Sequence, residues 1–241
     1  MSNAPVDVVK DFAPTGRLRA AINYGNSVLV QRNAATGELS GVTVELAREL
    51  GRRIGAPVDL VPFDAAGKVF EALKRGAWDI AFLAIEPVRA AEIDFTAPYV
   101  IIEGVYMVPT DSPLKSVADV DREGVRIAVN KGSAYDLYLS RTLKHATLHR
   151  SDDGIAQFKN EKLEAAGGVR QPLVEYAKTD PGVRVMDGRF MAIQQAMGTP
   201  KGRIAAVPYL RAFVEEMKAS GFVADALKRS NQPDAAVAPP A

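Results

Sequence analysis

An arginine that follows an apolar strand is the residue of this chain best suited to bind a small anion. Arg89 comes shortly after the apolar run 79–85, with Glu86 in the turn between them. Ligands of open α/β sheets bind beyond the carboxyl ends of the strands, and a guanidinium offers a carboxylate two parallel donors while keeping its charge. The sequence therefore predicts that Arg89 binds an anion. The alternative is a surface arginine that pairs with Glu92 or Asp94.

A second group of this kind opens a helix in the middle of the chain. Ser133 and Ala134 follow an expected strand at 125–130 and precede an expected helix at 135–143. Free N–H groups and the positive end of a helix attract anions, and a serine hydroxyl adds a donor. Ser133 is also a good ordinary N-cap, and both roles can hold together.

The composition excludes several functional classes. Apolar residues make up 47% and charged residues 24%, and the formal net charge of +1 gives no electrostatic reason to expect nucleic acid or an anionic membrane as a partner. The chain has no cysteine and only two histidines, which excludes thiol catalysis and cysteine-based metal sites. Because no nucleophile–base pair or glycine-rich phosphate loop is present, we expect no enzymatic centre, no cofactor and no metal.

The two ends of the chain carry little functional information. The first residues lack a basic region followed by an apolar run, so they do not form a signal peptide. No stretch approaches the roughly 18 apolar residues of a membrane span. We expect a cytoplasmic protein if the chain is complete and a periplasmic one if an export signal was removed. The proline- and alanine-rich residues 231–241 predict a disordered tail.

Strands and helices alternate along the chain, which predicts a mostly parallel α/β sheet covered by helices. Thr43 is the expected N-cap of the helix at 43–54, and Gly55 is expected just after its end. The strands are expected at 19–23, 27–31, 39–42, 58–62, 79–85, 99–109, 125–130, 163–167 and 189–197, and the helices at 43–54, 67–74, 135–143, 155–160, 173–178 and 204–220.

Two extended segments near 106–110 and 191–197 suggest that the middle of the chain is an inserted lobe. Two connecting strands would form a hinge. The expected organisation is a first lobe of residues 1–108 and 191–230, a second lobe of 109–190, and the tail. A single continuous α/β domain is the alternative.

Several segments, in their order along the chain, resemble one known family. They are GRLRAAIN, TGELSGVTVELARELGRRIGAPVDLVPF, FEALKRGAWDIAF, EPVRAAEIDFTAPY and GVRIAVNKGSAYDLYL. Together they are similar to the family 3 bacterial solute-binding proteins, the amino-acid receptors of ABC transporters. The resemblance covers about residues 16–230. It implies the two-lobed type II periplasmic-binding fold with a two-strand hinge, closing over a small ligand.

The resemblance also implies roles for individual residues of the first lobe. Arg89 matches the arginine that binds the carboxylate of the ligand. Asn23 and Asn26 fall where the family has a polar residue and an aromatic residue that covers the ligand, and the nearest aromatic here is Tyr24. Ala84 occupies a position where many members have a hydroxyl residue.

In the second lobe, Ser133 and Ala134 match the helix start that contacts the ligand. Val169 falls where an aspartate of the family receives the ammonium of the ligand. A buried ammonium without a carboxylate is costly, so either the ligand has no α-amino group or another acid replaces the aspartate. Glu86 is the best replacement, although it could equally pair with the neighbouring arginine. Arg170 could add a second cation and favour a dicarboxylate, unless it is simply solvated.

The leading interpretation is a monomeric receptor for a small carboxylate or amino acid, which serves an ABC permease and inserts into no membrane. Two alternatives remain open. One is an enzyme resembling the cyclohexadienyl (prephenate or arogenate) dehydratases of the same fold, with Glu86 or Glu164 as general acid. The other is a free-standing cytoplasmic sensor.

Overall fold

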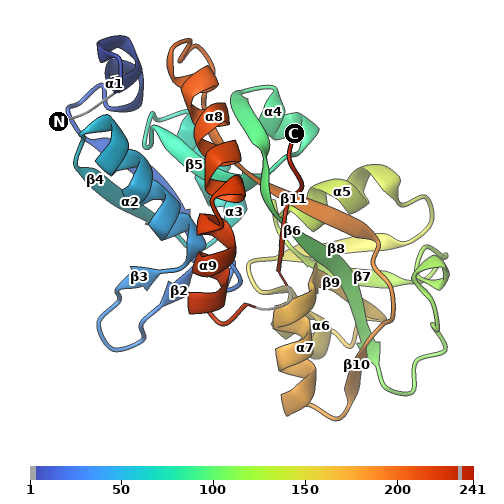
Figure 1. Ribbon diagram of the computed structural model, residues 1–241. Coiled ribbons are helices and arrows are strands. Elements are labelled where there is room, and N and C mark those ends of the chain that lie inside the picture. The colour runs from blue at the N-terminus through green and yellow to red at the C-terminus, as the bar shows by residue number, and fades with distance from the viewer. Residues whose placement is uncertain (1–3, 233–234) are drawn as a thin grey trace. The chain divides into compact units, whose positions relative to one another are not determined.

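The computed structural model describes residues 4–232 and 235–241. The chain forms two compact units, Met1–Ile101 with Gln194–Ala241, and Ile102–Ile193. They are joined by strands β6 (Ile93–Pro109) and β11 (Met191–Pro200), labelled in Figure 1. The boundaries between the units fall inside these strands, after Ile101 and Ile193, whereas the expected lobe boundaries were after residues 108 and 190. The first part of β6 pairs within unit 1 and its second part within unit 2.

The sheet of unit 1 is built around β1 (Leu18–Asn23). This strand lies between β4 (Val58–Phe63) and β5 (Ile80–Ala84) and is parallel to both, and β11 runs antiparallel to β5. Unit 1 also contains α1 (Val6–Phe12), β2 (Gln31–Arg32), β3 (Leu39–Ser40), α2 (Val42–Ile54), α3 (Ala66–Leu73), α4 (Pro87–Ala90), α8 (Ala206–Ala219) and α9 (Phe222–Arg229).

The start of α2 differs from the expectation. Its N-cap is Gly41, with φ of 112°, and Thr43 lies inside the helix with its hydroxyl donating to the carbonyl of Leu29 at 3.4 Å. A Cβ atom at residue 41 would lie 2.5 Å from the same carbonyl oxygen, so only glycine fits. The helix ends at Gly55 in the left-handed conformation, as predicted.

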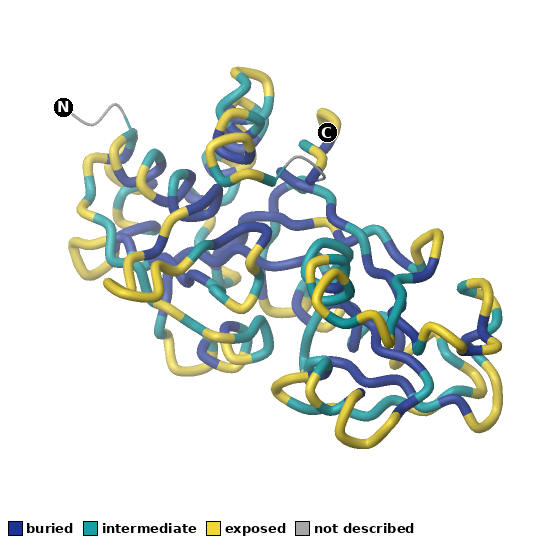
Figure 2. The backbone as a smooth tube through the Cα atoms, turned by 90° about the horizontal axis from the view of Figure 1, so that it is seen from below, coloured by how far each residue is buried: buried dark blue, intermediate teal, exposed yellow. Residues whose placement is uncertain are grey.

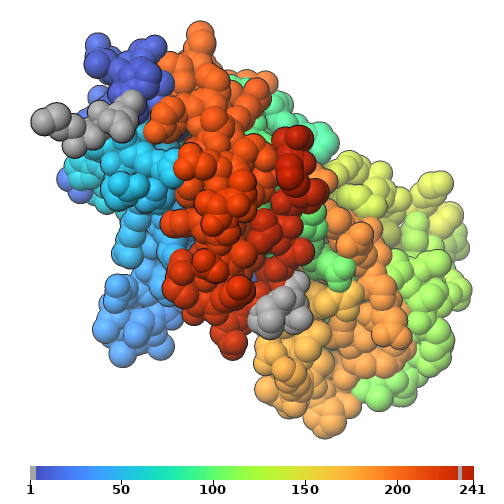
Figure 3. All heavy atoms as spheres, viewed as in Figure 1, coloured from blue at the N-terminus to red at the C-terminus, as the bar shows by residue number. Residues whose placement is uncertain are grey.

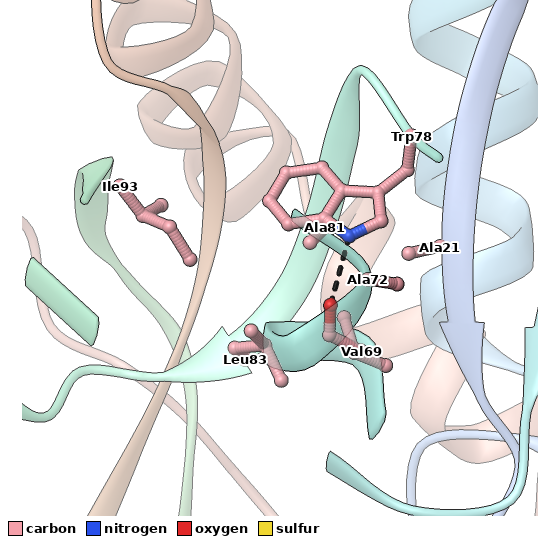
Figure 4. Packing of buried hydrophobic residues seen from close by; sticks show 7 residues of the cluster. All are labelled: Ala21, Val69, Ala72, Trp78, Ala81, Leu83 and Ile93. Atoms are coloured by element: carbon pink, nitrogen blue, oxygen red, sulfur yellow. Dashed lines mark hydrogen bonds between the residues drawn. The ribbon is translucent and has the colours of Figure 1, made fainter. Parts of the chain in front are cut away.

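The core of unit 1 is packed around Trp78. Figure 4 shows its indole among small and branched side chains, with Nε1 donating to the carbonyl of Val69 at 2.9 Å. All residues of β5 are buried, as its uninterrupted apolar sequence predicts for a strand covered on both faces. Figure 2 shows that burial is concentrated along the strands, whereas exposed residues gather in the loops.

A buried ion-pair cluster centred on Asp79, here called the Asp79 cluster, lies beside this core. Asp79 is 0% exposed and accepts hydrogen bonds from Nε and Nη2 of Arg19, both at 2.9 Å. Arg203, just before α8, approaches the same carboxylate at 3.4 Å. Thr199 of β11 donates to the carbonyl of Asp79 at 3.0 Å. The cluster therefore ties β1, β5 and β11 to the segment that leads into α8.

In unit 2, β7 (Arg126–Asn130) lies between β8 (Thr147–Ser151) and β9 (Ala165–Val169) and is parallel to both. The far side of β9 pairs antiparallel with β6, which also pairs with β10 (Val183–Val185). The helices are α5 (Ala134–Thr142), α6 (Gly154–Asn160) and α7 (Arg170–Thr179), with a short 3-10 turn at Val117–Asp119. The sequence pattern missed β8 because this partly exposed strand has polar residues on both faces.

The structure differs from the expectation that residues 231–241 are disordered. Residues 233 and 234 lie outside the described residues, but Ala236–Val237 form β12, which pairs with β6 at Ile101 and Val100. Lys218 of α8 donates to the carbonyl of Pro239 at 2.8 Å. Figure 3 shows the C-terminal residues, in dark red, lying along α8. The composition suggested disorder, but small alanine side chains can pack closely beside an available strand edge.

The hydroxyl of Tyr99 provides a first prediction about stability. Tyr99 is 0% exposed, its ring packs edge-on against Phe82 at 6.1 Å, and its hydroxyl has no hydrogen-bond partner among the described residues. Burial raises the pKa of this phenol far above its usual value. A buried unbonded hydroxyl costs about 1–3 kcal/mol, so Tyr99→Phe should keep or raise the thermal midpoint.

Thermal denaturation measures this effect, and Tyr176→Phe is the matched control. The hydroxyl of Tyr176 bonds the carboxylate of Asp180 at 3.2 Å, so its removal should not stabilise the protein. A clear drop in the midpoint for Tyr99→Phe would mean that the Tyr99 hydroxyl is hydrogen-bonded after all.

Candidate functional site

The carboxyl ends of β1 and β5 lie at the same edge of the unit 1 sheet. The parallel register pairs Ala20 with Ile80 and Ala21 with Ala81. The residues that follow the two strands therefore share this edge, which is where ligands of α/β sheets bind. We call the following set the unit 1 half-site: Asn23, Tyr24, Asn26, Ala84, Glu86 and Arg89.

Arg89 lies in the short helix α4 directly after β5, with Pro87 at its start. Its side chain is 1% exposed, and Nη1 donates to the carbonyl of Ala84 at 3.1 Å. Burial lowers the pKa of the guanidinium to about 10, and the charge of Glu86 opposes this shift. Arg89 therefore remains protonated at neutral pH. A guanidinium shielded from water attracts a carboxylate more strongly than an exposed one does.

Glu86 is the N-cap residue of α4 and is 2% exposed. Its backbone carbonyl accepts the N–H of Arg89 at 2.9 Å. The carboxylate also acts electrostatically on that guanidinium. The half-site thus contains one cation and one anion in a buried setting, and a ligand with both an acid and an amine would complement it as well as a simple acid.

The side chains expected to contact the ligand from the first loop make contacts with neighbouring residues of unit 1. Asn23 accepts the N–H of Gly25 at 3.1 Å, and Asn26 accepts the N–H of Val28 at 3.3 Å. The ring of Tyr24 has the guanidinium of Arg32 over its face, 4.8 Å from the centroid. These contacts shape the turn after β1.

The carboxyl ends of β7 and β9 define a corresponding edge in unit 2. Their parallel register pairs Ile127 with Ala165 and Ala128 with Ala166. We call the residues that follow these strands the unit 2 half-site, made up of Ser133, Ala134, Val169 and Arg170.

Ser133 is the N-cap of α5, and its Oγ accepts the N–H of Asp136 at 3.1 Å. The ordinary capping role is therefore present. The N–H groups of Ala134 and Tyr135, at the first two helical positions, have no acceptor within the helix by geometry. They remain suited to an anion.

Asp136 is a residue of this region that our sequence interpretation missed. It is 4% exposed, and its carboxylate accepts the N–H of Gly132 at 2.9 Å and Nε of Arg150 at 2.8 Å. The spacing of Ser133 and Asp136 is that of a capping box, and this signal could have revealed it.

Arg170 does not offer the free second cation that the sequence suggested. Its Nε donates to Glu103 at 2.6 Å and its Nη2 to the carbonyl of Gly188 at 2.7 Å. Glu103 also accepts Nη1 of Arg189 at 3.1 Å. Val169, next to Arg170, is the N-cap residue of α7 and makes no side-chain capping bond.

Glu164, one of the two acids considered for catalysis, is unsuited to general acid chemistry. Nε and Nη2 of Arg126 donate to its carboxylate at 2.9 and 2.8 Å. These bonds lower the pKa of Glu164, whereas a general acid at neutral pH needs a raised pKa. Glu164 also precedes β9 and so lies at the opposite end of the strand from Val169.

Comparison with known protein families matches residues 21–230 to the bacterial extracellular solute-binding proteins, family 3. The chain belongs to this family. The predicted resemblance is thus confirmed. Within residues 4–232 and 235–241, this solute-binding protein has no helix long and apolar enough to cross a membrane.

Two proteins similar to this solute-binding protein share less than a quarter of its sequence. The glutamine-binding protein of Geobacillus stearothermophilus is 22% identical over 207 residues, covering 83% of this chain and 79% of that protein. The solved L-cysteine receptor of Neisseria gonorrhoeae has a TM-score of 0.79 at 23% identity, covering 93% of this chain and 94% of the receptor.

A third similar structure is an ancestral amino-acid-binding protein described as a precursor of cyclohexadienyl dehydratase. It has a TM-score of 0.75 at 21% identity, and the match covers 92% of this chain and 98% of that protein. At such identities the solved structures establish the fold. They confirm the predicted α/β class and its type II periplasmic-binding architecture.

Proposed function

We propose that this family 3 protein is a receptor that binds a small carboxylate or amino acid for uptake by an ABC transporter. The observation that carries the proposal is the buried guanidinium of Arg89 at the carboxyl edge of the unit 1 sheet. Relatives named for binding glutamine and L-cysteine support a ligand of this size and chemistry.

In the proposed mode, Arg89 binds the carboxylate through two parallel hydrogen bonds, which fixes its orientation. The start of α5 in unit 2, with Ser133 and the first helical N–H groups, offers a separate set of donors to an acceptor group.

The dehydratase alternative has weaker support. Glu164 is held by Arg126, which leaves Glu86 of the two acids that the sequence suggested for catalysis. The solved relative connected with a dehydratase is itself an amino-acid-binding protein. Incubation of the pure protein with prephenate or arogenate, and detection of the aromatic product, tests this alternative directly.

A thermal-shift screen of small carboxylic acids tests the proposed function. A ligand at 100 times its Kd stabilises the folded state by about 2.7 kcal/mol, which is a rise of several degrees for a chain of this size. We expect at least one acid to produce such a shift and its primary amide to produce none. Shifts that come only from cationic or uncharged compounds would overturn the proposal.

The transport role is tested separately by cell fractionation. Recovery of the protein in the periplasm is the expected result for a receptor that serves a permease. Recovery only in the cytoplasm would favour the free-standing sensor.

A further inference from the structure

We propose that Gln195 of β11 is a specificity residue at the unit 1 half-site, selecting carboxylate ligands that also carry an uncharged hydrogen-bonding group, such as a side-chain amide or a hydroxyl. This inference rests on the proposed function, because it assumes that Arg89 binds a carboxylate. It adds the chemical class of the ligand and a residue to which our sequence interpretation assigned no role.

Gln195 stands apart from other buried polar side chains of unit 1. It is 6% exposed, and its amide makes no hydrogen bond among the residues that the structure describes. Thr199, four residues later on the same strand, is also buried, but its hydroxyl donates to the carbonyl of Asp79 at 3.0 Å. Buried polar groups normally have a hydrogen-bond partner, because leaving one unpaired is unfavourable. The amide of Gln195 is therefore suited to a partner that comes from solution.

The amide group is the accessible part of this side chain. Fully buried side-chain atoms without a hydrogen bond do occur in unit 1, for example the hydroxyl oxygen of Tyr99, but neither amide atom of Gln195 is one of them. The amide nitrogen and oxygen thus keep contact with accessible space, although the residue as a whole is covered. A molecule from solution can reach both the donor and the acceptor.

Gln195 lies directly beside Ala84, at the carboxyl end of β5. The two residues are partners in the antiparallel register of β5 and β11, and the N–H of Ile85 donates to the carbonyl of Gln194 at 2.9 Å. Bonded and non-bonded pairs alternate along antiparallel strands, so Ala84 and Gln195 form the closer, non-hydrogen-bonded kind of pair, with their Cα atoms about 4.5 Å apart. Their side chains point to the same face of the sheet.

Ala84 also holds the guanidinium of Arg89, since its carbonyl accepts Nη1 at 3.1 Å. In a non-hydrogen-bonded pair this carbonyl points away from the partner strand, here β11, and toward the side of β1. The guanidinium and Gln195 therefore lie on two sides of one residue, at the same edge of unit 1. We expect a ligand that is bound to Arg89 through its carboxylate to reach Gln195 with a group a few bonds away.

The surroundings of the amide are apolar. Phe82 lies two residues before Ala84 and Met197 two residues after Gln195, so both share this face of the sheet. Their exposed fractions are 3% and 0%. In such surroundings a hydrogen bond is stronger, and an unpaired polar group is more costly, than in water. The amide should therefore discriminate strongly between ligands that can pair with it and ligands that cannot.

The chemistry of the amide defines the ligand class. A glutamine side chain is uncharged and offers both donors and an acceptor. A primary amide on the ligand can exchange two hydrogen bonds with it, and a hydroxyl can form at least one. An apolar group of the same size would displace water from the amide of Gln195 and leave it unpaired. The preferred ligands are therefore carboxylates whose far end carries an amide or a hydroxyl.

Glu86 is a separate feature of the same half-site. It lies two residues after Ala84, and its carboxylate acts on the guanidinium of Arg89. An amine on the ligand would complement this acid, whereas Gln195 concerns a different group of the ligand. The test therefore uses pairs of ligands that are identical in carboxylate and in amine, so that the effect of Glu86 cancels within each pair.

Calorimetric titration of the full chain with such pairs tests the inference. The pairs are L-glutamine and L-methionine, L-threonine and L-valine, and, without an amine, glutaramate and hexanoate. The members of each pair have similar size and equal charge and differ in whether the far group can form hydrogen bonds. We expect the polar member of at least one pair to bind about 10-fold or more tightly than the apolar member.

Substitutions of two neighbouring glutamines assign this preference to one side chain. Gln195→Met should keep the thermal midpoint, because no internal hydrogen bond is lost. It should weaken binding of the polar member about 10-fold and leave binding of the apolar member nearly unchanged. Gln194→Met is the matched control, since Gln194 is exposed on the same strand, and it should change neither affinity. Gln195→Asn keeps the polarity but shortens the side chain, so it tests the same position in case the methionine variant does not fold, and it should also lose most of the preference.

The possible results separate this inference from the proposed function. Apolar members that bind the wild-type protein as tightly as their polar partners overturn the inference and leave the receptor proposal standing. An unchanged preference in folded Gln195→Met or Gln195→Asn also overturns it, as does an equal loss of affinity for both members of a pair. If no carboxylate binds at all, both proposals fail.

Discussion

Replacement of Arg89 by lysine should weaken binding of the carboxylate ligand by about 30-fold to several thousand-fold. Loss of a partner in a buried, charge-assisted hydrogen-bond pair costs about 2–5 kcal/mol, and each 1.4 kcal/mol is a factor of ten. Lysine keeps the charge but lacks the planar fork that can bind both carboxylate oxygens. Arg89→Ala removes the charge as well, so its binding should become undetectable.

The structure also predicts how stable these variants are. Arg89 is 1% exposed and its charge acts on Glu86, which is 2% exposed. The alanine variant would bury that carboxylate without its cation, so it should be less stable than the wild-type protein. Arg89→Lys is therefore the more informative variant, and thermal melts should accompany every titration.

The control for this experiment is Arg48→Lys, which changes an exposed arginine of α2 in the same unit. It should leave the affinity unchanged. Near-native affinity in folded Arg89→Lys and Arg89→Ala would remove Arg89 from the binding site.

The second large expected effect is on the stability of the folded protein. Asp79→Asn should destabilise the protein by about 3–5 kcal/mol, because it breaks a buried ion pair by removing one partner. Asp79 is 0% exposed, and both Arg19 and Arg203 point at its carboxylate. Side-chain exposures of 27% and 24% let the two arginines regain some water, so the lower part of this range is expected.

Urea and thermal denaturation measure the loss, and the expected drop in the midpoint is about 6–12 °C. Asp59→Asn is the matched control. It breaks an equally well-formed pair with Arg17 at 2.6 Å, in which the side chains are 42% and 50% exposed. Exposed pairs contribute little to stability. Equal midpoints for the two variants would show that burial of the Asp79 cluster does not stabilise the fold.

The features predicted correctly from the sequence are local ones. The apolar run ending at Ala84 and the glycine at residue 55 carry their own signals, since a doubly covered strand is continuously apolar and a helix end favours glycine. The position of Arg89 after β5 followed from the same local reasoning. A capping signal was misread at Thr43 because the tight approach of Gly41 to Leu29 cannot be seen in a local pattern.

The features that escaped prediction depend on contacts between distant parts of the chain. Glu103 and Arg170 are 67 residues apart, so nothing local indicates that the arginine is already paired. Phe190 meets Tyr106 only because β6 and the segment before β11 are neighbours in the folded unit. The C-terminal tail has the composition of a disordered segment, but the backbone of β6 supplies it with a partner.

One titration tests most directly whether the guanidinium of Arg89 binds the carboxylate of the ligand. The acid with the largest thermal shift and its primary amide are each titrated into the wild-type protein and into Arg89→Lys. A cycle of this kind isolates the interaction between the two changed groups. We predict that the amide binds the wild-type protein at least about 30-fold more weakly than the acid, and that the difference shrinks markedly in the variant. An acid-to-amide ratio that is the same in both proteins would contradict the account.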